Sequence, residues 1–93
     1  MNTINISTAA AIIAARLRAI APAEEQNPQG EDTAASAGIA DMDALAADPD
    51  AFGDRDSAMN AIEMAVDATA EYTESGWVDD EANAAHEAVK ENV

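Results

Sequence analysis

The stretch ISTAAAIIAARLRAI, residues 6–20, is the most apolar segment of this 93-residue chain and decides how the rest can fold. Its apolar residues recur at spacings of 4, 3, 4 and 3 positions, as on one face of an amphipathic helix. These residues are Ile6, Ala10, Ile13, Leu17 and Ile20. Ser7 or Thr8 can cap the start of this helix, and Pro22 ends it by disfavouring helix at Ala21. The pattern predicts a helix on whose apolar face the rest of the chain packs.

The next stretch, AEEQNPQGEDTAASAG at residues 23–38, has no large apolar side chain and is expected to be a flexible loop. A short helix over residues 39–48, with Asp41 as its N-cap, is predicted from the spacing of Ile39, Met42 and Leu45. The turn DPDAFGDRD follows, and its Phe52 is predicted to fill the core.

A longer helix is predicted from Ser57 to Ser75, with Asp54 or Asp56 as its N-cap and Gly76 at its C-terminal stop. One side of this helix carries apolar residues or threonines at helical spacing, namely Met59, Ile62, Val66, Thr69 and Thr73.

The last predicted helix starts at Asp80, with Asp79 as its N-cap and acidic side chains in its first turn, where they complement the helix dipole. Its inner face would consist of Ala82, Ala85, Ala88 and Val89. Trp77 and Val78 would anchor the joint that precedes it. The chain is therefore expected to be one all-α domain over residues 1–93, a small bundle of three long helices and one short helix with alanine-rich interfaces.

The charge of the chain is strongly negative and unevenly distributed. Nineteen Asp and Glu residues against four Lys and Arg give a formal net charge of −15, and all nineteen acids follow residue 23. Four cations cannot neutralise many phosphates, which excludes a basic patch for nucleic acid or for an anionic membrane. The absence of cysteine excludes disulfides and thiol chemistry. The apolar stretches are too short to span a bilayer, so a cytoplasmic protein is expected.

Several acids gather on one side of the predicted helix over residues 57–75. On a helical wheel with 100° per residue, five acids fall within a sector about 80° wide. They are Asp56, Glu63, Asp67, Glu71 and Glu74. Like charges at i, i+4 oppose a helix by about 0.2–0.5 kcal/mol per pair, so stability alone does not explain this row. Its members would stand about 6 Å apart along the helix axis, the scale of the phosphate spacing in a nucleic-acid strand. The surface would extend onto the last helix through Asp79, Asp80 and Glu81.

This acidic surface predicts a mimic of nucleic-acid phosphates, which would occupy the basic groove of a nucleic-acid-binding protein. In its length, acidity and Ala-rich helices, and in segments such as WVDDEANAAHEAVKE at residues 77–91, the chain resembles the small acidic DNA-mimic inhibitors of phages and mobile elements, the anti-CRISPR and antirestriction proteins. The resemblance implies a non-enzymatic inhibitor of a host defence nuclease or effector complex, acting in the bacterial cytoplasm. These proteins share no single fold, so no binding residue is transferred from them.

Two other interpretations remain open. The segment FGDRDSAMNAIEMAVD at residues 52–67 is similar to the Asp-Ser-Leu region of acyl carrier proteins, and that resemblance implies phosphopantetheine on Ser57, although Ala58 stands where the motif has leucine. Alternatively, the acids are the solvated surface of a helical interaction protein from a high-salt organism.

Metal-binding and enzymatic functions are not expected. An EF-hand register starting at Asp48 puts Phe52 and Met59 where the loop needs acidic ligands. His86 is the only histidine, and no Gly-rich phosphate loop is present, so neither a catalytic site nor a cofactor is predicted. A homodimer built on the first helix is possible, since thin Ala-rich cores gain stability by association. Met64, opposite the apolar stripe of its helix, is expected to be exposed.

Overall fold

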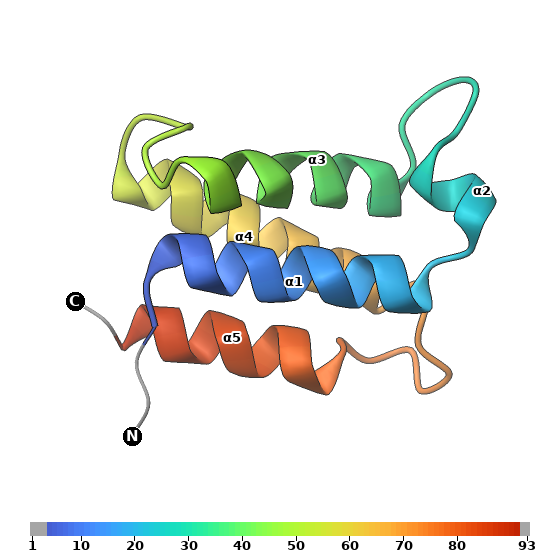
Figure 1. Cartoon of the computed structure of the whole chain (residues 1–93). Helices are drawn as coiled ribbons and strands as arrows, with labels where there is room; N and C mark the ends of the chain where they lie inside the picture. The colour runs from blue at the N-terminus through green and yellow to red at the C-terminus, as the bar shows by residue number, and fades with distance from the viewer. Residues whose placement is uncertain (1–3, 92–93) are drawn as a thin grey trace.

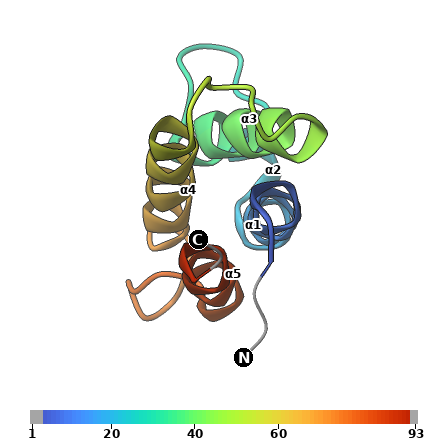
Figure 2. The same cartoon turned by 90° about the vertical axis from the view of Figure 1, so that its left-hand side faces the viewer.

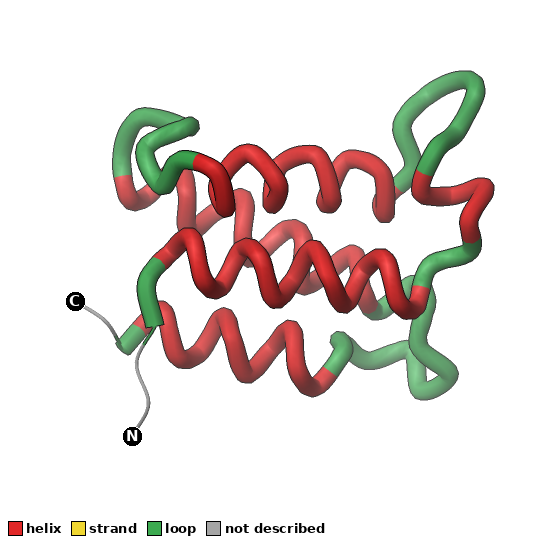
Figure 3. The backbone as a smooth tube through the Cα atoms, viewed as in Figure 1, coloured by secondary structure: helices red, strands yellow, loops and turns green. Residues whose placement is uncertain are grey.

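The computed structural model describes residues 4–91, which form a helical bundle whose Cα atoms span 37 × 28 × 16 Å (Figure 1). Its helices are α1 (Ile6–Ile20), α2 (Ala23–Gln26), α3 (Ala34–Ala47), α4 (Arg55–Thr69) and α5 (Asp80–Lys90). No residue between 4 and 91 lies in a strand (Figure 3). The all-α class is confirmed. The layout differs from the prediction, because residues 4–91 contain four helices of 11 to 15 residues and one of four residues.

Helix α1 packs against α3, α4 and α5, and a view along α1 shows these three helices on different sides of it (Figure 2). Ala10, Ile13 and Leu17 of the predicted apolar face are fully buried, while Ile6 and Ile20 at its ends are half-buried. This face, on which a homodimer was considered, is therefore used within the bundle. The homodimer itself stays a prediction.

The N-cap of α1 is Asn5, so the prediction of Ser7 or Thr8 was wrong. The Asn5 side chain accepts a hydrogen bond from the backbone N–H of Thr8 at 2.8 Å. Ser7 is already helical, and its hydroxyl donates to the backbone carbonyl of Leu45 in α3 at 3.1 Å. The end of α1 is as predicted, since Ala21 before Pro22 has extended backbone angles.

Residues 23–38 are more helical than expected, because they hold α2 and the first turns of α3. Helix α3 begins at Ala34, where Thr33 and Ser36 form a reciprocal capping box, so Asp41 is not its N-cap. The small residues of this stretch favoured the prediction of a loop. In the structure Ala35 and Gly38 are buried in the interface of α3, where their small size lets them fit. Gly38 permits a close approach, since a Cβ there would lie 2.9 Å from Leu17 Cδ1.

Helix α4 is shorter than predicted and ends at Thr69, although Asp54 is its N-cap as expected. The backbone N–H groups of residues 70–72 donate to carbonyls three positions earlier, which tightens the chain into turns. Thr69 accepts a hydrogen bond from the N–H of Asp79 at 2.8 Å and so ties the end of α4 to the start of α5. Gly76 adopts a positive φ of 75° within this connection instead of at the helix end.

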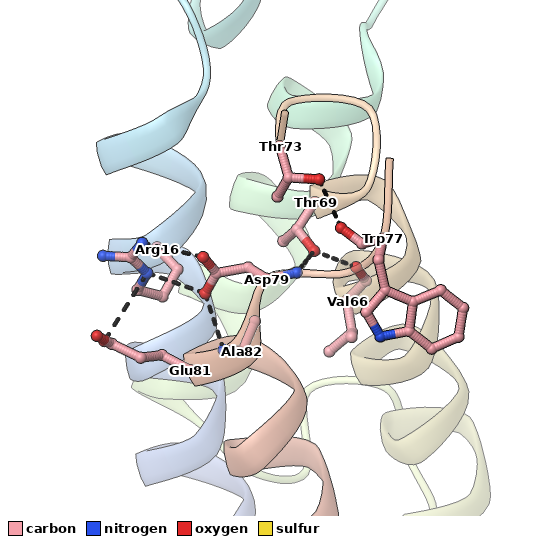
Figure 4. Close-up of polar contacts among 8 residues, drawn as sticks. All are labelled: Arg16, Val66, Thr69, Thr73, Trp77, Asp79, Glu81 and Ala82. Carbon is pink, nitrogen blue, oxygen red and sulfur yellow. Dashed lines mark hydrogen bonds and ion pairs between the residues drawn. The ribbon is translucent and has the colours of Figure 1, made fainter. Parts of the chain in front are cut away.

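Two aromatic residues lie at the surface: Phe52, which was expected to fill the core, and Trp77, which was expected to anchor the joint before α5. Phe52 is 37% exposed and Trp77 is 68% exposed. The Trp77 carbonyl accepts a hydrogen bond from Thr73, and its N–H donates to Ser75, so the backbone is held while the indole lies on the outside of the connection (Figure 4). Val78 packs partly buried against the core, as predicted, and α5 starts after the N-cap Asp79, also as predicted.

Candidate interaction surface

Helix α4 presents its acids on the side away from the core. Ala58, Ile62 and Ala65 are buried against the other helices, whereas the side chains that lie about half a turn away on the helical wheel are exposed. These exposed acids are Asp56, Glu63 and Asp67. Glu63 and Asp67 are separated by one helical turn, about 6 Å of rise. We call the five carboxylates Asp56, Glu63, Asp67, Glu71 and Glu74 the α4 ridge.

The last two members of the α4 ridge do not lie on the helix. Glu71 and Glu74 follow its end at Thr69 and are exposed in the turns of residues 70–76. Because α4 stops early, the predicted helical sector is correct only for Asp56, Glu63 and Asp67. The remaining two acids continue the negative surface from a loop.

All four cationic side chains of the protein bind elsewhere. Arg16 pairs with Asp79, Arg18 with Asp43 and Lys90 with Glu87, while Arg55 donates to the carbonyl of Val89. Within residues 4–91, no carboxylate of the α4 ridge forms an ion pair. The ridge is therefore an un-neutralised anionic surface.

Asp79, which was predicted to extend the binding surface, is a structural residue. It is only 9% exposed, and Arg16 donates to both of its carboxylate oxygens at 2.9 Å (Figure 4). Asp79 also accepts from the N–H of Ala82 at the start of α5 at 3.1 Å. The hydrogen bonds from Arg16 hold the pKa of Asp79 below its usual range. The carboxylate joins α1 to α5, so it is not available to a partner.

The neighbouring acids of α5 are accessible. Asp80 and Glu81 are both exposed in the first turn of α5, as the sequence predicted. Glu81 lies 3.8 Å from Arg16, which already holds Asp79, so part of its charge is shared with that arginine. Asp80 is the exposed member of the predicted extension that forms no ion pair among the described residues.

A groove between α3 and α4 lies beside the α4 ridge. It has a volume of about 390 Å³ and is lined by Ala34, Ala37, Gly38, Asp41, Met64, Ala65, Asp67, Ala68 and Glu71. A second hollow continues past Asp41 and Met64 toward Phe52, Ser57 and Asn60. The sequence does not predict this contribution of α3, because residues 34–38 are expected to form part of a loop. The pattern Thr33-x-x-Ser36, with Ala between and after, was the signal that could have indicated a helix start.

A third hollow lies on the other side of α4, toward α5. Its lining includes Asp56 and Glu63 from α4 and His86 and Lys90 from α5. Among residues 4–91, Lys90 forms an ion pair with Glu87 at 3.8 Å and none with Asp56 or Glu63. The α4 ridge thus separates an α3-side groove from an α5-side hollow.

Ser57 is exposed in the first turn of α4, where its backbone N–H donates to Asp54 at 2.7 Å. This hydrogen bond lowers the pKa of Asp54 from its ordinary value.

Within residues 4–91, no three His, Asp or Glu side chains are grouped in a way that could hold a metal ion. No helix in this part of the chain is both long enough and apolar enough to cross a membrane. Comparisons with protein families, with curated proteins and with solved structures find no match to the chain.

Proposed function

We propose that the protein is a non-enzymatic acidic inhibitor that presents the carboxylates of the α4 ridge where a nucleic acid would present phosphates. Its partner is a basic nucleic-acid-binding protein or complex, such as a defence nuclease or effector. The observation that carries this proposal is the segregation of charge, because within residues 4–91 no arginine or lysine forms an ion pair with a carboxylate of the α4 ridge.

Two physical consequences of this segregation favour binding to a basic surface. Adjacent carboxylates on α4 repel one another, so a partner that supplies cations relieves the repulsion. An un-neutralised surface also produces a long-range potential that speeds the encounter with a basic groove and disfavours acidic partners. Asp80 and Glu81 lie on a separate helix and are secondary contributors, while Asp79 is excluded by its ion pair with Arg16.

The test is competition with DNA for purified defence effectors, measured by the fluorescence anisotropy of a labelled duplex. The variant Glu63→Lys/Asp67→Lys should weaken competition by about a hundredfold, because two like charges would face a basic groove. The matched control is Glu24→Lys/Glu31→Lys, which makes the same change in net charge at exposed positions outside the α4 ridge. Circular dichroism should show equal helix content in the two variants.

The conservative exchange Glu63→Asp/Asp67→Glu should compete almost as well as the natural protein, since charge matters here more than side-chain length. Competition should also weaken steeply as salt rises from about 50 to 200 mM. Equal competition by the two lysine variants would show that the α4 ridge is not the binding surface. A salt-independent affinity would argue against phosphate mimicry.

A further inference from the structure

The groove between α3 and α4 has a floor made of small residues. A Cβ at Gly38 would lie 3.6 Å from the Cβ of Ala65, so the two helices are close at this point. Ala34 and Ala37 line the α3 side, and Ala68 lines the α4 side. Because none of these side chains extends beyond a methyl group, the helices leave an apolar depression of about 390 Å³.

Large apolar side chains border this depression. Met64 is 64% exposed and lines both the groove and the hollow that continues from it, where Phe52 lies. Among residues 4–91, the large hydrophobic side chains that are exposed are Phe52, Met64 and Trp77, so two of the three gather here. Methionine is flexible and polarisable, and it adapts to a partner's side chain at little cost.

The charged residues at the rim of the groove are all acidic. Asp41 comes from α3, Asp67 from α4 and Glu71 from the turn that follows, and no arginine or lysine lines either hollow. None of these three acids is in an ion pair within the described residues. A partner must therefore bring positive charge around an apolar centre.

We propose that this groove docks an amphipathic basic helix of the partner, with apolar side chains against Met64 and lysines or arginines against the acidic rim. The inference rests on the proposed function and deepens it, because the partner's basic surface must carry apolar anchors and not cations alone. Helix-in-groove recognition supplies such anchors at i, i+3 and i+4 spacing. Charge complementarity selects this occupant, since a second copy would place Asp41, Asp67 and Glu71 near like charges.

The test uses two labelled peptides of identical leucine and lysine composition. In one the leucines lie on one face of a helix, and in the other they are scrambled around it. Anisotropy titrations with the full chain should show about tenfold tighter binding of the amphipathic peptide, the effect of burying one further apolar side chain. Equal affinity for the two peptides, or no binding of either, would overturn the proposal.

A variant that fills the groove distinguishes docking in the groove from binding by charge alone. Ala37→Leu adds bulk at an exposed lining position without changing charge, and it should remove the preference for the amphipathic peptide. Ala40→Leu is the matched control, since Ala40 is an exposed residue of the same helix and lines none of the hollows around α4. Met64→Ala should reduce the preference in the same way. A preference retained by Ala37→Leu would place the peptide elsewhere and overturn the proposal.

Failure of docking is distinguishable from failure of the proposed function. If Ala37→Leu still competes with DNA as Ala40→Leu does while Glu63→Lys/Asp67→Lys does not, the α4 ridge acts alone and the groove proposal is overturned. If Ala37→Leu loses competition with its charge intact, the groove proposal is supported. Analytical ultracentrifugation tests whether a second copy occupies the groove. If the natural chain is a dimer and Met64→Ala dissociates it, the groove belongs to a second copy and the proposal is overturned.

Discussion

Replacing Gly38 by alanine should destabilise the protein, although alanine is the better helix former. Gly38 is buried in α3, and the new Cβ would lie 2.9 Å from Leu17 Cδ1 and 3.6 Å from the Cβ of Ala65. Leu17 is completely buried in α1, so its methyl group cannot move aside into solvent. The substitution thus sets helix propensity against overpacking at the contact of α1 with α3.

The magnitudes decide the sign. A glycine-to-alanine change inside a helix stabilises by about 0.5–1 kcal/mol. Overpacking a filled core costs about 1–3 kcal/mol. We therefore expect a net loss of about 1 kcal/mol in the free energy of unfolding, or about 4–8 °C in Tm for a domain of this size.

Leu17→Val isolates the steric contribution, because it removes the methyl group that would clash. In that background Gly38→Ala should stabilise the protein by about 0.5–1 kcal/mol, the propensity gain alone. Ala40→Gly, at an exposed position of α3, measures the propensity difference in the same helix and should cost about 1 kcal/mol.

The assay is urea unfolding followed by circular dichroism at 222 nm, at constant salt. Fluorescence is the poorer probe, since Trp77 is exposed in the folded state. Refutation would be a higher midpoint for Gly38→Ala in the natural background, or the same change in both backgrounds, with m unchanged. Either result would mean that α1 and α3 are not in the close contact described.

Other expectations concern single side chains and salt. Arg16 lowers the pKa of Asp79 in the folded state. The ionised carboxylate therefore stabilises the protein at neutral pH, and this stabilisation disappears as the pH falls from about 4 through the folded-state pKa. The difference in urea midpoint between the natural protein and Asp79→Asn should shrink over that range. Tyr72→Phe should cost about 1 kcal/mol in the same assay, because the hydroxyl accepts a hydrogen bond from the N–H of buried Ala35. Incubation with coenzyme A and a phosphopantetheinyl transferase should add no mass, and an addition that Ser57→Ala abolishes would favour a carrier protein. Circular dichroism should show a helical protein at about 0.1 M salt, whereas helix formation only in molar salt would favour a halophilic interaction protein.

The helices that were predicted accurately are those whose signals are local. The apolar periodicity over residues 6–20 and the Asp79 cap before α5 were sufficient to place α1 and α5. The start of α3 was missed because burial there depends on small residues, which give no periodic signal. The end of α4 was missed because Thr69 there accepts a hydrogen bond from the N–H of Asp79, a tertiary contact that the local sequence does not reveal.

The same distinction applies to the candidate surface. Exposure of Glu63 and Asp67 followed from the helical period, since both lie in the regular part of α4. The role of Asp79 could not be inferred in this way, because Arg16 is 63 residues away in the chain and reaches it only when α1 and α5 pack together. The acidic rim at Asp41 likewise depends on the position of α3 beside α4.

The composition of the core gives the exposed Met64 its significance. Among residues 4–91, ten of the eighteen buried hydrophobic residues are alanines, so the bundle gains little apolar burial from each helix contact. A chain selected for stability alone would place its few large apolar side chains inside. Met64 instead lies exposed on α4, where it lines the groove together with Asp41, Asp67 and Glu71. Met64 is thus a large apolar side chain that lies outside a thin core, next to carboxylates that form no ion pairs. A partner that covers both the side chain and the carboxylates explains this arrangement better than the folding of the monomer does.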